Sequence, residues 1–86
     1  MKLKKEFIVH STGDESILVP TGAANFSGIV KGNKTVGFIF DCLRTETTRD
    51  EIISKLKEAF DAPAGAVKRD VDKTLDELRG IGAIDE

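Results

Sequence analysis

The stretch VKGNKTVGFIFDCL, from Val30 to Leu43, contains the change of pattern that decides the fold. Upstream of it, short apolar runs alternate with turn-forming residues, whereas inside it the apolar residues recur every three or four positions. Asn33 or Thr35 can cap a helix that ends at Leu43, because short polar side chains accept hydrogen bonds from the free amides of a first helical turn. The apolar face of this helix comprises Val36, Ile39, Phe40 and Leu43. We therefore expect strands before this point and helices after it.

Three short apolar runs precede the first helix and predict an antiparallel sheet. They lie at residues 5–10, 16–20 and 24–31, and Gly, Pro, Ser and Asp residues separate them. Because the connections are short, we expect a meander in which the second strand is central and the first and third strands are edges.

Two more helices are expected downstream. Thr48 and Glu51 have the spacing of a capping box, in which the Thr48 hydroxyl accepts from the Glu51 amide and the Glu51 carboxylate accepts from the Thr48 amide. This helix must end before Pro63. A third helix is expected from about residue 65 or 66 to about residue 79, and Ile84 then belongs to a short final strand or a packed tail. The buried positions of these helices are Ile52, Ile53, Leu56 and Phe60, and then Val67, Val71, Thr74, Leu75 and Leu78.

These elements together predict an α+β fold. It consists of a three-stranded antiparallel sheet over about residues 3–32, followed by a three-helix bundle of the winged helix-turn-helix type over about residues 34–82. A length of 86 residues leaves room for one hydrophobic core, so residues 1–86 are expected to form a single domain.

Composition excludes several classes of function. The apolar runs are far shorter than the roughly 20 residues that a membrane span needs, and no secretory signal is recognisable, so we expect a cytoplasmic protein that binds no membrane. Cys42 and His10 are the only cysteine and the only histidine. They leave no constellation for a metal site, a disulfide or a nucleophile with its base. We expect no catalytic residues, no metal and no cofactor.

The stretch that begins at Val30 resembles the signature of the pyrroloquinoline quinone biosynthesis protein D family. In that signature an apolar strand is followed by Leu-Asn-Glu-Thr-Gly and an apolar helix. Downstream, Thr48-x-x-Glu-Ile and Leu75-x-x-Leu-x-x-x-Gly-x-Ile also fit, so the resemblance spans nearly the full chain. The chain departs from the signature at three positions, where Gly32 replaces Leu, Lys34 replaces Glu and Phe40 replaces Trp.

The resemblance implies a peptide-binding adaptor rather than an enzyme. Domains of this family recognise the precursors of ribosomally made, post-translationally modified peptides. They hold an extended leader peptide as an added strand on the third strand, beside the third helix. They present it to a maturation enzyme, often a radical S-adenosylmethionine protein. The residues expected to bind the peptide are Phe26, Ser27, Gly28, Ile29, Val30 and Lys31 on the strand and Lys68, Val71, Asp72 and Leu75 on the helix.

Charge along the two edge strands also favours the third strand as the binding edge. The first strand is expected to carry Lys2, Lys4, Lys5 and Glu6, so this edge is charged. Residues 26–30 carry no charge, and charged side chains normally protect an edge against pairing. The third strand is therefore expected to stay open for strand addition, and Gly28 lets a second backbone approach closely.

The sequence does not decide which flank of the third helix faces this strand. Lys68 and Asp72 lie on one flank, and Asp70, Thr74 and Glu77 lie on the other. We take Lys68 and Asp72 as the first candidates for peptide contact, and a plain solvated face as the alternative.

Two other functions remain open at this point. A winged helix can bind nucleic acid, but residues 35–86 carry eight basic and twelve acidic side chains, and the two signs alternate along the third helix. A phosphate-binding helix normally has an unbalanced basic face, so we expect no nucleic-acid partner. The third strand can also pair with its own copy, which makes the protein either a monomer or a strand-mediated dimer.

Overall fold

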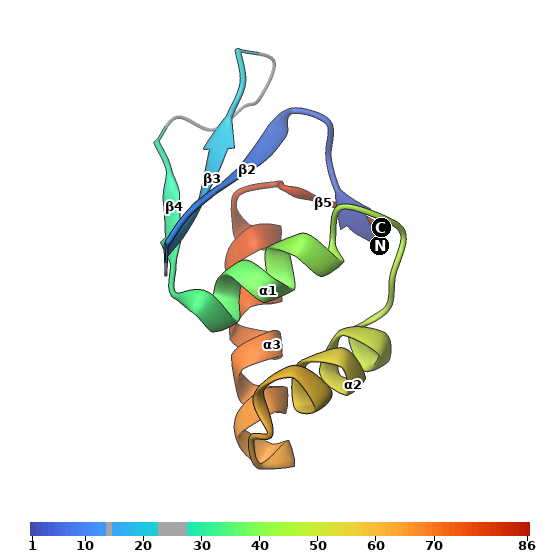
Figure 1. The fold of residues 1–86 in the computed structure, drawn as a ribbon. Coiled ribbons are helices and arrows are strands. Elements are labelled where there is room, and N and C mark those ends of the chain that lie inside the picture. The colour runs from blue at the N-terminus through green and yellow to red at the C-terminus, as the bar shows by residue number, and fades with distance from the viewer. Residues whose placement is uncertain (14, 23–27) are drawn as a thin grey trace.

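The structure is a computed structural model that describes residues 1–13, 15–22 and 28–86. Its helices and strands follow one another in the expected order, with an additional pair of short strands at the ends of the chain (Figure 1). The elements are β1 (Lys2–Leu3), β2 (Phe7–Thr12), β3 (Glu15–Pro20), β4 (Val30–Gly32), α1 (Lys34–Cys42), α2 (Arg49–Phe60), α3 (Ala64–Gly80) and β5 (Ile84–Asp85). The prediction of an α+β fold, with a three-stranded antiparallel sheet followed by three helices, is confirmed.

Strand β3 is the centre of the three-stranded sheet, as expected. The order is β2-β3-β4 and both pairings are antiparallel. One face of the sheet packs on the core, because Phe7, Ser16 and Leu18 are buried there. The alternate residues, such as Ile8 on β2, lie on the opposite face, and Figure 1 shows the helices on the core side only.

The third strand begins later than the sequence indicates, as far as the structure describes it. Of the described residues in the predicted strand, Gly28 and Ile29 lie outside the ladder, which includes Val30–Gly32. Gly28 has a φ of +119°, a left-handed conformation that suits glycine, so the chain bends there before it enters β4. Ile29 lies between the bend and the strand. Phe26 and Ser27 lie outside the described residues.

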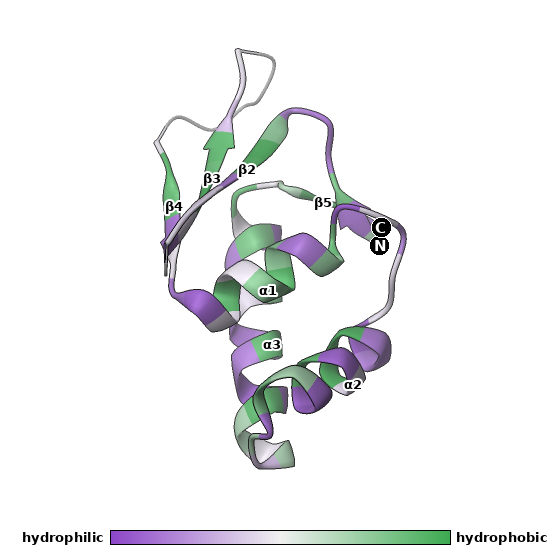
Figure 2. Cartoon of the chain, in the orientation of Figure 1, coloured by the Kyte–Doolittle hydropathy of each residue, from purple (hydrophilic) through white to green (hydrophobic). Residues whose placement is uncertain are grey.

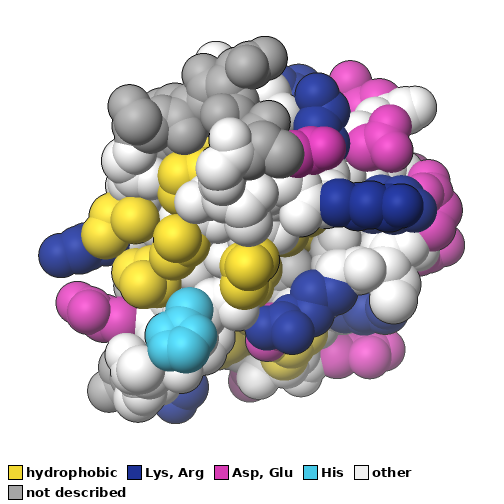
Figure 3. All heavy atoms as spheres, turned by 90° about the horizontal axis from the view of Figure 1, so that it is seen from above, with side chains coloured by type: hydrophobic (Ala, Val, Ile, Leu, Met, Phe, Trp, Pro, Cys, Tyr) yellow, Lys and Arg dark blue, Asp and Glu magenta, His cyan; other side chains and the backbone are white. Residues whose placement is uncertain are grey.

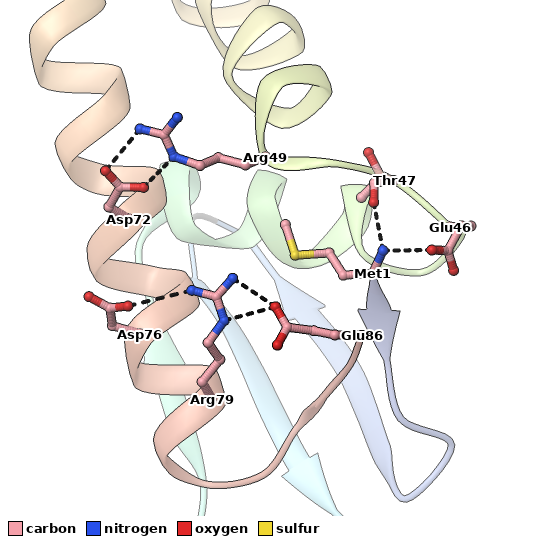
Figure 4. A network of polar contacts seen from close by, with 8 residues as sticks. All are labelled: Met1, Glu46, Thr47, Arg49, Asp72, Asp76, Arg79 and Glu86. Carbon is pink, nitrogen blue, oxygen red and sulfur yellow. Dashed lines mark hydrogen bonds and ion pairs between the residues drawn. The ribbon is translucent and has the colours of Figure 1, made fainter.

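The ends of the chain form a second sheet, in which Leu3 pairs with Ile84. The predicted final strand at Ile84 is therefore confirmed. At the end of α3, Arg79 donates to Glu86 at 2.8 and 3.1 Å and also contacts Asp76, so the segment after β5 is joined to the helix (Figure 4).

Helix α1 begins where the sequence predicts, because Asn33 Oδ1 accepts from the Val36 amide at 3.0 Å. The helix contacts β3 as well as α2 and α3. Gly37 makes the contact with β3 possible, since a Cβ at this position would overlap the Ser16 side chain. The position of α1 therefore depends on a small residue on the helix facing a small residue on the central strand.

The cap of helix α2 is confirmed in part. Thr48 Oγ1 accepts from the Glu51 amide at 3.2 Å, as expected. The Glu51 carboxylate, however, accepts from the hydroxyl of Thr47 at 3.0 Å, so it reaches a neighbouring side chain. The helix ends at Asp61, whose φ of +47° reverses the chain before Pro63.

The core lies where the three helices meet the sheet, and Figure 2 shows that the helices and strands around it carry hydrophobic residues. Phe40 is fully buried at its centre. All five buried positions predicted for α3 are buried, and α2 buries Ile52, Ile53 and Leu56 while Phe60 packs edge-on against Phe38. In the part of the chain that the structure describes, no helix has the length and apolar character needed to span a bilayer.

Candidate functional site

A groove lies between the junction of β4 with α1 and one flank of α3. Its volume is about 290 Å³. The residues that line it are Lys31, Gly32, Asn33, Thr35, Val36, Asp70, Lys73, Thr74 and Glu77. The groove thus combines the end of an edge strand with the side of a long helix, which is an arrangement that suits an extended ligand.

The hydrogen-bonding pattern of the sheet follows from two bonds at the start of β2. The Thr21 amide donates to Glu6 O at 2.7 Å, which makes these two residues a hydrogen-bonded pair. The Phe7 amide, one residue later, donates to Lys4 O at 3.1 Å and so points away from β3. Because bonded and non-bonded pairs alternate in an antiparallel ladder, Ile17 and the other odd-numbered residues of β3 bond to β2. The even-numbered residues of β3 must then bond to β4.

The same alternation identifies the free groups of β4. Leu18 is opposite Val30 and Ser16 is opposite Gly32, so the backbone groups of Val30 and Gly32 point toward β3. The N–H and C=O of Lys31 point in the opposite direction, to the edge that no described strand covers. Ile29 has the same parity as Lys31. The edge beside the groove therefore offers backbone donors and acceptors to a ligand.

Gly32 and Val36 form the part of the groove where β4 turns into α1. A Cβ built on Gly32 would lie 2.6 Å from the Val36 Cβ and would overlap one of the Val36 methyl groups. The Val36 side chain therefore occupies the space that a side chain at position 32 would need. The departure from the family signature at Gly32 is accompanied by a β-branched residue that packs on the glycine.

Helix α3 faces the groove with the flank that carries Asp70, Thr74 and Glu77. The spacings of four and three residues place these side chains on one side of the helix. Lys73 and Lys31 also line the groove, so two lysines and two carboxylates surround it. The groove is consequently polar with balanced charge, and it does not form an anion site.

Asp72, a predicted peptide contact, does not line this groove, and its role in binding stays a prediction. Its carboxylate accepts two hydrogen bonds from Arg49 of α2, at 2.6 and 3.0 Å (Figure 4). These charge-assisted bonds lower the pKa of Asp72 below its ordinary value. Lys68 is exposed but does not line the groove. The flank with Lys68 and Asp72 therefore lies outside the groove, and the flank with Asp70, Thr74 and Glu77 lines it.

Val71 and Leu75, two other residues expected to contact the peptide, lie in the core. Their exposed fractions are 0% and 1%, so their side chains have no surface to offer to a ligand. They hold the helix against the sheet and thereby position Thr74, which lies beside them in the groove wall.

The argument from edge charge also needs correction. The residues Phe7–Thr12, which form β2, contain no Lys, Arg, Asp or Glu, because Lys2 lies on β1 and Lys4 and Lys5 lie in the following turn. Charge on the ladder therefore does not favour β4 as the open edge, because Lys31 lies on β4 itself. The feature that distinguishes β4 is the groove that it shares with α3.

Sequence reasoning missed most of the groove lining. Asn33, Thr35 and Val36 were read only as parts of a helix cap and a core face, although they also follow an open edge strand directly. The spacing of Asp70, Thr74 and Glu77 was visible, but nothing in the sequence showed that Arg49 would engage the opposite flank. Among the described residues, no group of His, Cys, Asp and Glu side chains is arranged to hold a metal ion.

Comparisons with known proteins agree with this geometry. The family model described as coenzyme PQQ synthesis protein D matches residues 15–84. The solved structure of TbiB1 in complex with the TbiA(beta) leader peptide superimposes with a TM-score of 0.75 and 18% sequence identity. The match covers 99% of this chain and 100% of that one, so the two share their fold over their whole lengths. Among curated proteins, none matches this chain significantly.

Proposed function

Because the chain belongs to the coenzyme PQQ synthesis protein D family, we propose that it binds the leader of a ribosomally made precursor peptide as an added strand along β4. The observation that carries this proposal is the free edge of β4 opposite the flank of α3, with the groove between them. TbiB1, which has the same fold, was solved with a leader peptide. Residues 1–86 act as one peptide-binding domain in this proposal.

The peptide gains its affinity from backbone bonds and its register from side-chain contacts. The outward N–H and C=O of Lys31, with those of Ile29, form the ladder with the added strand. Alternate side chains of the peptide then enter the groove, where they meet Val36, Thr74 and the charged residues of α3. The mixed charge selects for peptides with both a basic and an acidic or polar residue near this point.

The partner that receives the peptide is a separate maturation enzyme, for which a radical S-adenosylmethionine protein is our first candidate. The adaptor itself performs no chemistry in this proposal and needs no cofactor. Its site of action is the cytoplasm, where precursor peptides are made. It works as a monomer, because a copy paired on β4 would occupy the edge that the leader requires.

The test uses synthetic peptides that cover the N-terminal halves of the short open reading frames encoded beside this gene. Hydrogen exchange is measured on the full chain with and without each peptide. We expect one peptide to bind and to protect the amides of Ile29 and Lys31, with little change at Phe7–His10. Binding without new protection at Ile29 and Lys31 would exclude strand addition at β4, and the absence of any binding peptide would contradict the proposal as a whole.

A further inference from the structure

The outer face of the three-stranded sheet is apolar and lies uncovered by any described helix. Ile8 on β2 is 54% exposed and Ile29 is 50% exposed, and these are the exposed large hydrophobic residues of the described chain. In the ladder Ile8 is opposite Val19 and His10 is opposite Ile17, so the apolar residues form one continuous patch. Figure 3 shows hydrophobic side chains gathered on this face beside the histidine, with lysine or arginine side chains at its border. Such patches mark sites of protein association.

A trough with cationic walls runs along the β2 side of this patch. It has a volume of about 340 Å³, and the apolar residues that line it come from β1 and β2 and include Ile8. Four cations line it, namely Lys2, Lys4, Lys5 and Arg44, and no carboxylate does. Arg44 is bonded to Asp41 at 2.9 Å, whereas Lys4 and Lys5 are exposed and form no ion pair with the described residues.

The edge of β2 beside the trough has free backbone groups. By the alternation established above, Ile8 and His10 bond to β3, so the N–H and C=O groups of Val9 and Ser11 point outward. The structure describes no strand that pairs with this edge. The trough therefore combines three features that recognise an extended chain: free backbone groups on a strand edge, apolar lining residues, and lysines that form no ion pair with the described residues.

We propose that the β2 edge and this trough form a second docking surface, which takes an extended segment of a partner protein whose residues alternate between apolar and acidic. Charge complementarity identifies the occupant, because carboxylates are the groups that the lysines lack. An extended segment satisfies the outward N–H and C=O groups of Val9 and Ser11, which a layer of lipid headgroups does not. The surface lies across β3 from the leader groove, so the adaptor can hold a leader and a second protein together.

The probe is the synthetic peptide Ac-EVEIEVE-NH2, with Ac-KVKIKVK-NH2 as its charge-reversed match. Both are titrated into the full chain labelled with ¹⁵N, and amide shifts are recorded. The acidic peptide should shift the amides of Ile8, Val9 and Ser11 and leave those of Ile29 and Lys31 unchanged. The double variant Lys4→Glu/Lys5→Glu should weaken its binding about tenfold, and raising the salt concentration should weaken it as well. The matched control Lys55→Glu/Lys57→Glu alters exposed lysines on α2 and should bind like the parent.

Each of the other results would overturn the proposal. Equal binding of the basic peptide, or no shift up to millimolar concentration, would remove charge complementarity as the basis of recognition. Shifts confined to Ile29 and Lys31 would assign the acidic peptide to the leader groove. A dimer in sedimentation that dissociates in Ile8→Glu would make a second copy the occupant. Binding to anionic vesicles that Lys4→Glu/Lys5→Glu abolishes would make it a lipid surface. The leader experiment reads different amides, so either proposal can fail without the other.

Discussion

The contact between Gly32 and Val36 can be tested by exchanging the side chain across it. In Gly32→Ala the new methyl group would lie 2.6 Å from the Val36 Cβ, which is closer than two carbons can pack. Relief requires movement of β4 or of the first turn of α1, and overpacking of this kind costs about 1–3 kcal/mol. Because a domain of this size is stabilised by only about 5–15 kcal/mol, the loss is easily measured.

The compensating change is Val36→Gly, which removes the three atoms that would lie nearest to the new methyl group. Val36→Gly alone should destabilise the protein, because glycine in a helix costs up to about 1 kcal/mol and some apolar contact is lost. In that background Gly32→Ala should not lower the free energy of unfolding. It should raise it by about 0.4–1 kcal/mol where alanine reduces the conformational entropy of the unfolded chain. The coupling energy between the two positions should therefore be about 1–3 kcal/mol in favour of the double variant.

The assay is urea unfolding of the parent, the two single variants and the double variant, analysed as a double-mutant cycle. A strong coupling energy would establish that the Val36 side chain occupies the space above Gly32. Additive effects would refute the reasoning, since they would mean that Val36 does not pack on the glycine. So would a Gly32→Ala variant as stable as the parent.

Three further predictions concern the strand edge, the core and the exposed ion pair. Val30→Pro should lower the free energy of unfolding, because it removes an amide that points toward β3. Lys31→Pro should leave folding nearly intact and weaken leader binding, because it removes an amide that points outward. The opposite pattern in thermal unfolding and binding assays would reverse our assignment of the edge. Phe40→Ala should lower the free energy of unfolding by about 3–5 kcal/mol and Thr48→Ala by about 1 kcal/mol. If denaturant unfolding shows that Thr48→Ala is less stable than Phe40→Ala, the positions of α1 and α2 are contradicted. The pKa of Asp72 is lowered in the folded state, so the stability that Asp72 contributes is complete above its unfolded pKa of 3.8 and is lost as the pH falls through the lower folded pKa. Asp72→Asn should remove this part of the acid dependence without affecting leader binding. Unfolding measured against pH and a binding assay would check both outcomes.

The elements that local chemistry determines were predictable from the sequence. The period of the apolar residues identified the buried positions of α3, and short polar residues before α1 and α2 identified Thr48 as a cap and Asn33 as one of two candidates. The short connections gave the order of the sheet with β3 in the centre. Each of these features depends on residues a few positions apart, so a single sequence contains the information.

The features that depend on long-range packing were not predictable in the same way. The flank of α3 that lines the groove depends on how the buried side of the helix packs in the core, and Arg49 bonds to Asp72, 23 residues away, on the other flank. The start of β4 depends on the bend at Gly28. The lysines near the first strand were assigned to the edge because the sequence did not separate β1 from β2. The apolar period predicted the burial of Val71 and Leu75, and the sequence alone did not separate buried positions from positions that line the groove.

The two outer strands of the sheet, β2 and β4, each leave an alternate set of backbone groups unpaired among the described strands. Backbone geometry alone would make them equivalent, so the side chains beside each edge must determine what binds. The β4 groove has two lysines and two carboxylates, and the β2 trough has four cations and no carboxylate. Binding to a charge-balanced groove should change little with salt, whereas binding to an unbalanced one should weaken as salt screens the charges. A titration of both peptides between about 50 and 500 mM salt should therefore leave leader affinity nearly constant and reduce the affinity of the acidic peptide severalfold. Parallel losses for the two peptides would show that side-chain charge does not distinguish the edges, and the assignment of separate partners to β2 and β4 would have to be abandoned.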